Sequence, residues 1–135
     1  MLAPKKTKMR KPHRPNVRGK ATSNNKVAFG QFGLKAMTGS WVKATQLEAA
    51  RKVLTKYTSR GGKVWIRAFP HQSITNKGSQ STMGGGKGVP EYFIALVKPG
   101  NILFELEGIP RDQAQKALIT AAYKLPLKAK FIEKN

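Results

Sequence analysis

The spacing of hydrophobic residues in the middle of the chain predicts an amphipathic helix. Thr45 and Glu48 have the spacing of a capping box, so we expect the helix to begin at Thr45. Gly61 and Gly62 favour its end shortly before them. The apolar positions between these signals recur at intervals of three and four residues, which places them on one helical face. They are Leu47, Ala50, Leu54 and Tyr57.

A second apolar stripe predicts another helix closer to the C-terminal end. It follows Pro110, a residue favoured in the first turn of a helix, and it ends before Pro126. Its members share one helical face and are Ala114, Ala117, Leu118, Ala121 and Leu125.

Six further segments are rich in β-branched and aromatic residues, which is typical of strands. Pro99 and Gly100 separate two of them and predict a hairpin. This mixed order predicts an α+β fold, a two-layer sandwich of mostly antiparallel sheet with two packed helices. The predicted strands are 27–37 with a bend or bulge, 40–43, 63–69, 90–97, 101–107 and 128–132.

The charge balance of the chain predicts a binding partner. The chain has 135 residues, with 26 Lys plus Arg against 6 Asp plus Glu and a net charge of +20. The length fits one domain. So large an excess of positive charge in a small chain favours a polyanionic partner, above all a nucleic acid.

The same composition excludes several classes of protein. There is no cysteine, which excludes disulfide scaffolds and thiolate zinc sites, and with only His13 and His71 we expect no metal or other cofactor. No apolar stretch is long enough to span a membrane, and the N-terminal residues lack the hydrophobic region of a secretory signal. We therefore expect neither a membrane partner nor a small-molecule substrate.

The positive charge is concentrated at the N-terminal end. The first acidic residue is Glu48, and residues 1–47 hold 11 basic residues. Three prolines interrupt residues 1–26, so we predict an extended basic arm there that RNA or DNA orders, followed by a single domain at 27–135. A solvated tail and an organellar transit peptide are the alternatives.

Two other basic features lie in the predicted domain. Lys52 and Lys56 fall on the outer face of the first helix with Arg51 beside them, although an ordinary solvated face would look the same. Residues 71–89 contain five glycines, Lys77 and Lys87 but no acid. We predict a long loop whose backbone closely approaches phosphates, with a flexible linker as the alternative.

No pattern in the chain predicts catalysis. The glycines around Lys87 do not match a phosphate loop or a dinucleotide fingerprint. Glu105 and Glu107 resemble an exposed acidic pair, which we interpret as the polar face of a sheet. Most aromatic residues, Trp41 and Trp65 included, are expected in the core rather than as base-stacking platforms. An RNA-modifying enzyme is therefore disfavoured, as is an architectural DNA-binding protein, for which no groove-reading element is present.

The order of short motifs along nearly the whole chain resembles one family, the bacterial and organellar type of large-subunit ribosomal protein sixteen. The chain departs from that pattern at Thr82, Gly85 and His71. The matching segments are MLAPKKTK at 1–8, RKPHR at 10–14, FGQFGLKA at 29–36, QLEAAR at 46–51, GKVWIRAFP at 62–70, MGGGKG at 83–88, EY at 91–92, PG at 99–100 and KLPLK at 124–128.

The resemblance implies a structural constituent of the large ribosomal subunit that is not an enzyme. It implies large-subunit rRNA, neighbouring ribosomal proteins and the aminoacyl-site tRNA as partners, with 5S rRNA and the central protuberance nearby, in a bacterial or organellar ribosome, with a plastid favoured. The residues expected to bind RNA are Lys5, Lys6, Lys8, Arg10, Lys11, His13, Arg14, Arg18, Lys20, Arg51, Arg60, Arg67, Lys77 and Lys87.

Overall fold

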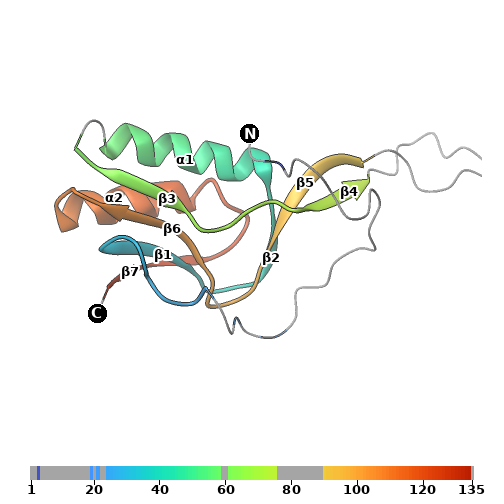
Figure 1. Cartoon of the computed structure of the whole chain (residues 1–135), viewed down its shortest axis with the longest axis horizontal. Helices are drawn as coiled ribbons and strands as arrows, with labels where there is room; N and C mark the ends of the chain where they lie inside the picture. Colours follow the sequence, from blue (N-terminus) through green and yellow to red (C-terminus); the bar gives the residue numbers. More distant parts are fainter. Residues whose placement is uncertain are drawn as a thin grey trace, which may run out of the picture.

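The computed structural model describes residues 3, 19, 21, 24–58, 61–75 and 90–134 (Figure 1). Among them it contains seven strands and two helices, which confirms the predicted α+β class. All strand pairs are antiparallel, and they form two separate sheets.

The larger sheet has four strands in the order β3-β6-β1-β7. Its bounds are Lys63–Ile66 for β3, Ile102–Glu107 for β6, Phe32–Ala36 for β1 and Ala129–Glu133 for β7. The register between β1 and β6 shifts between Leu34 and Lys35. This irregularity confirms a bulge in the first predicted strand, although the strand itself is shorter than 27–37.

The smaller sheet has three strands in the order β2-β5-β4. They are Ser40–Lys43, Pro90–Val97 and Gln72–Thr75. In Figure 1, β4 and the beginning of β5 extend away from the sheet that the helices cover. The smaller sheet therefore projects from the body of the molecule.

Both helices pack on the larger sheet and on each other. Helix α1 spans Ala44–Thr58, and its predicted face is inward, with Leu47, Ala50 and Leu54 buried and Tyr57 packed against the core. Helix α2 spans Arg111–Ala122 and buries the four alanine and leucine residues of its stripe up to Ala121. The two stripes meet the sheet residues in one hydrophobic core.

The ends of the helices differ from the predicted ones. Thr45 does not cap α1, because the helix begins one residue earlier and the Gln46 side chain accepts a hydrogen bond from the Lys43 N–H at 2.8 Å. Helix α2 ends at Ala122, and Leu125 is buried in the following turn, where its N–H donates to the Ala122 carbonyl.

The predicted hairpin at Pro99 and Gly100 is wrong. β5 and β6 are consecutive along the chain, but β5 pairs with β2 and β4 whereas β6 pairs with β1 and β3. Gly100, with φ of +101°, lies in the turn that carries the chain from one sheet to the other. Turn residues mark a change of direction, and they do not by themselves specify which strands pair.

The predicted loop at 71–89 is also shorter than expected. Its first part forms β4, which pairs with β5 along Gln72–Thr75. Residues 76–89 lie outside the described residues and connect these two paired strands. The short, partly polar sequence of β4 gave no periodic signal, and its strand conformation comes from pairing with β5.

Candidate nucleic-acid interface

Most of the residues predicted to bind RNA lie outside the described part of the chain. Arg51 and Arg67 are described, and the structure shows both in ion pairs within the chain. The predicted contacts that lie outside the described residues are Lys5, Lys6, Lys8, Arg10, Lys11, His13, Arg14, Arg18, Lys20, Arg60, Lys77 and Lys87.

Arg51 lies on the partly exposed side of α1, one turn after Glu48. Its Nε donates to Glu48 Oε2 at 3.2 Å, and this bond lowers the pKa of Glu48 and raises that of Arg51. Lys52 and Lys56 are exposed on the same helix, as the apolar stripe predicts. The only acid on α1, Glu48, thus pairs with Arg51 and not with Lys52, and the outer face of the helix keeps its positive charge.

Arg67 follows β3 and has a mainly internal position. Its side chain is 18% exposed, and its guanidinium donates to Oε2 of Glu105. Trp65 on β3 pairs with Glu105 on β6. Arg67 follows two residues after Trp65 and therefore lies close to Glu105. Arg67 therefore stabilises the fold, and RNA contact by this residue stays a prediction.

Glu105 contradicts the interpretation of residues 105 and 107 as an exposed acidic pair. Its side chain is fully buried, whereas Glu107 at the end of β6 is partly exposed. Three consecutive backbone N–H groups donate to its Oε1, from Ala28 at 3.1 Å and from Phe29 and Gly30 at 2.8 Å each. The segment before β1 folds over this carboxylate and covers it.

These contacts set the ionisation of Glu105. Burial acts to raise the pKa, but the hydrogen bonds from the Gly30 N–H, Arg67, and the Phe29 and Ala28 N–H groups outweigh it and lower the pKa of Glu105. The group is therefore a buried anion with both oxygens bound. It holds the chain in place and has no free acid–base function.

Several aromatic side chains lie outside the core, contrary to expectation. Phe32 and Phe104 are buried, but Phe29, Phe69 and Tyr123 are exposed. Phe29 stacks on Trp65 with ring centroids 6.2 Å apart, and the Arg67 guanidinium lies 5.0 Å from the Phe29 centroid. Both bind the segment before β1 to the edge strand β3. Gly30, next to Phe29, lets the backbone approach the sheet closely, since a Cβ atom there would lie 2.5 Å from the Leu106 carbonyl oxygen.

The end of the predicted arm is attached to the domain at a second place. Asn24 accepts from the Ile102 N–H at 2.9 Å, and its Nδ2 donates to the Ile102 carbonyl at 3.1 Å. Ala21 donates to the Pro99 carbonyl at 3.0 Å. Asn24 has φ of +54°, a left-handed conformation that asparagine tolerates better than most residues. The end of the predicted arm and the segment after it are therefore attached to the domain at Ala21, Asn24 and residues 28–30.

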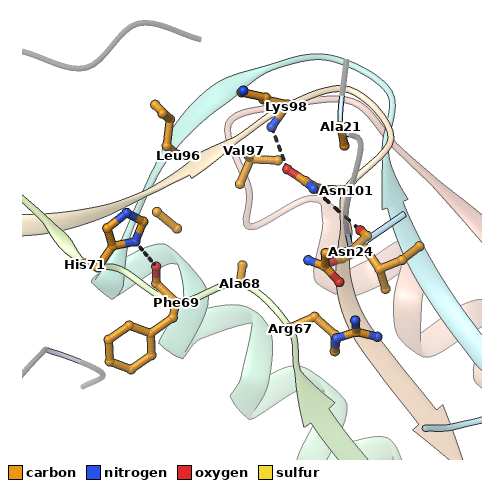
Figure 2. Close-up of a pocket in the computed structure, with 12 residues that line it drawn as sticks. Ala21, Asn24, Arg67, Ala68, Phe69, His71, Leu96, Val97, Lys98 and Asn101 are labelled. Atoms are coloured by element: carbon orange, nitrogen blue, oxygen red, sulfur yellow. Dashed lines mark hydrogen bonds between the residues drawn. The ribbon is translucent and has the colours of Figure 1, made fainter. Parts of the chain in front are cut away.

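A pocket opens beside this attachment (Figure 2). It has a volume of about 330 Å³ and lies where the connection from β3 to β4, the end of β5 and the turn between β5 and β6 meet. Figure 2 shows Phe69 and His71 on one side and Asn24 and Asn101 on the opposite side, with Leu96 above. Its lining includes apolar side chains such as Leu96 and Val97 of β5 and polar side chains such as Asn24, Asn101 and His71.

Among the described residues, neither a metal-binding cluster nor a membrane-spanning helix is found. No group of three His, Cys, Asp or Glu residues among them could hold a metal ion. No described helix is long and apolar enough to cross a membrane. What the described structure does provide is a point of attachment for two basic segments: Ala21 and Asn24 bind the end of the arm to the domain, and β4 and β5 flank residues 76–89.

Comparisons with known proteins agree along the length of the chain. The family described as ribosomal protein L16p/L10e matches residues 4–132. The large ribosomal subunit protein uL16c of Porphyra purpurea is 50% identical over 135 residues, covering 100% of this chain and 97% of that protein. The uL16c protein of Thalassiosira pseudonana is 52% identical over 132 residues, covering 98% and 96%. The uL16 protein of Trichodesmium erythraeum is 50% identical over 132 residues, covering 98% and 96%.

Proposed function

This chain belongs to the ribosomal protein L16p/L10e family, and from that premise we propose that it binds the rRNA of the large ribosomal subunit. Membership makes it a structural protein of the large subunit and not an enzyme. The family resemblance predicted from the sequence is confirmed. The alternatives of an RNA-modifying enzyme and of a non-ribosomal DNA-binding protein are set aside.

The net charge of +20 is the observation that carries the proposal of direct rRNA binding. Lysines and arginines that contact phosphates release condensed counterions, which supplies a large, salt-dependent part of the affinity. The acid-free segment 1–47 provides the highest density of these charges. The attachment of Ala21, Asn24 and residues 28–30 to the domain supports an arrangement in which the arm starts from a fixed point on the protein.

We also propose that the protein lies beside the aminoacyl-tRNA site, close to 5S rRNA and the central protuberance. The family resemblance supports this placement. The projecting strands β4 and β5 support it too, because they flank residues 76–89, which include Lys77 and Lys87. In this arrangement the loop contacts RNA near the tRNA, while the helices face the surrounding rRNA.

The sources of the relatives support a bacterial or plastid-type ribosome. Porphyra purpurea and Thalassiosira pseudonana have uL16c proteins, and Trichodesmium erythraeum, a cyanobacterium, has a uL16 protein of similar identity. Because these sequence identities are nearly equal, they support a bacterial ribosome and a plastid ribosome alike.

A binding experiment tests the proposal directly. Full-length protein is titrated with the large-subunit rRNA of Trichodesmium erythraeum and with random duplex DNA of the same length, over a series of salt concentrations. We expect affinity for rRNA to fall steeply with salt and to exceed affinity for DNA at about 150 mM. Equal affinity for the two nucleic acids at that salt concentration would contradict specific rRNA binding.

A further inference from the structure

We propose that the pocket next to Asn24 holds one unstacked nucleotide of the large-subunit rRNA, with its base between the two sheets. The inference rests on the proposed function and adds a defined contact to it. According to this inference, the protein recognises one base directly, whereas its other expected contacts are with the RNA backbone. Four features of the pocket support this assignment.

The first feature is its size and apolar walls. A volume of about 330 Å³ falls at the lower end of the range of small-molecule sites. Ala68, Leu96 and Val97 form walls against which a flat heterocycle can lie. Sequence-specific RNA recognition relies on bases that leave the stack and enter such sites.

The second feature is an aromatic side at the mouth. Phe69 is 45% exposed although it is a large hydrophobic residue, and His71 beside it is exposed as well. The Nδ1 atom of His71 lies 3.2 Å from the Phe69 carbonyl oxygen, so Nδ1 is the donor and the imidazole is held in place. Phenylalanine and histidine rings are common stacking partners of unpaired bases.

The third feature is an unsatisfied acceptor on the opposite side. The Oδ1 atom of Asn24 is buried and has no hydrogen-bond partner among the residues that the structure describes, whereas its Nδ2 donates to the Ile102 carbonyl. A buried acceptor without a donor is costly, and residues in left-handed conformations such as Asn24 cluster at binding sites. An exocyclic amino group or a ring N–H of a base would supply the missing donor once the Asn24 side chain turned its Oδ1 atom toward the pocket that this residue lines.

The fourth feature is the charge around the pocket. No acidic residue is among those that line it, and Arg67, His71 and Lys98 are. Because Arg67 already neutralises Glu105, Lys98 is the group available for a phosphate at the rim. An inserted apolar side chain of another protein would use neither Lys98 nor the Asn24 acceptor, so the lining favours a nucleotide.

Chemical footprinting on the full-length protein tests this inference. The probe is the large-subunit rRNA of Trichodesmium erythraeum, with dimethyl sulfate and carbodiimide to report base edges and hydroxyl radicals to report the backbone. Phe69→Ala and His71→Ala each remove a ring from the aromatic side, and Leu96→Trp fills the space. Tyr123→Ala removes an aromatic ring that is 81% exposed outside the pocket and is the matched control. Thermal unfolding confirms that each variant is folded.

We expect the wild type and the control to protect the same single base, and the three pocket variants to lose that protection while keeping the backbone footprint. Affinity should fall about tenfold for each ring removed, which is typical of the loss of one base stack. An unchanged base pattern with an intact backbone footprint would overturn the pocket inference alone. Absence of any footprint with the wild type would overturn the proposed function as well.

Discussion

Glu105 and Arg67 form a buried ion pair in which one carboxylate oxygen binds the guanidinium and the other accepts three backbone N–H groups from residues 28–30. Glu105 thus connects β6, the chain after β3 and the segment before β1. Replacing one partner of such a pair leaves the other charge buried without compensation, which is far more costly than the pair is worth as a whole.

Glu105→Gln should therefore strongly destabilise the protein. The amide nitrogen of glutamine would face either the guanidinium or the three N–H groups, so donors would meet donors. We expect the free energy of unfolding, measured with urea, to fall by about 3 kcal/mol. Glu107→Gln, two residues along the same strand and partly exposed, is the control and should change stability by less than about 0.5 kcal/mol. Equal effects of the two substitutions would contradict the role of Glu105.

Stability should also fall in acid because of this residue. The pKa of Glu105 lies below its ordinary value of 4.5 in the folded chain, so near and below pH 4.5 the unfolded chain binds more protons. The contribution of ionised Glu105 to the free energy of unfolding is complete above pH 4.5. It is lost as the pH falls through the pKa that Glu105 has in the folded chain. Urea unfolding of the wild type and of Glu105→Gln at several pH values checks this. The difference between them should shrink below pH 4.5, and a constant difference would contradict it.

Gly30→Ala should destabilise the same region by a steric effect. A Cβ atom on Gly30 would lie 2.5 Å from the Leu106 carbonyl oxygen, so the segment would move away from the sheet and from Glu105. We expect a loss of about 1 to 3 kcal/mol, measured by urea unfolding. Gly61→Ala is the control, because the nearest atom to its Cβ would be 4.0 Å away. Wild-type stability of Gly30→Ala would show that the segment is not tightly held.

Two truncations should separate the arm from the fold. Removal of residues 1–20 takes away eight basic residues and leaves the hydrogen bonds of Ala21, Asn24 and residues 28–30 in place. We expect unchanged helical circular dichroism and weaker rRNA binding with a smaller salt dependence. Removal of residues 1–30 deprives Glu105 of three donors and should cost at least 3 kcal/mol. Similar stability of the two truncated proteins would contradict attachment at residues 21–30.

The sequence predicted the parts of the fold that depend on local periodicity. The apolar stripes of both helices are confirmed, because burial repeats regularly along them. The strand at residues 40–43 and the last strand are also confirmed, and their β-branched and aromatic residues were the signal. The pairing of β5 and β6 with different sheets could not be predicted, since it depends on partners distant in sequence. β4 was missed for the same reason.

The buried role of Glu105 shows where sequence reasoning about the site was incomplete. An acid in a strand is usually solvated, and alternation placed Glu105 and Glu107 on the same face. One signal could have revealed the difference. Glu105 lies between Phe104 and Leu106 in a strand that is otherwise apolar from Ile102 to Leu106. Such a central strand is buried on both faces, and a carboxylate there needs internal partners. Those partners are backbone groups about 75 residues earlier, which no local pattern identifies.

The topology of the larger sheet also determines when its strands can pair during synthesis. β1 lies between β6 and β7, and both partners are made long after β1 during synthesis. A nascent chain therefore carries β1 with two unpaired edges, next to a highly basic segment, until most of the described chain has been translated. Unpaired edges favour wrong associations, and contacts between distant residues form slowly. The larger sheet of this protein can therefore complete its pairing only after β7 has been made.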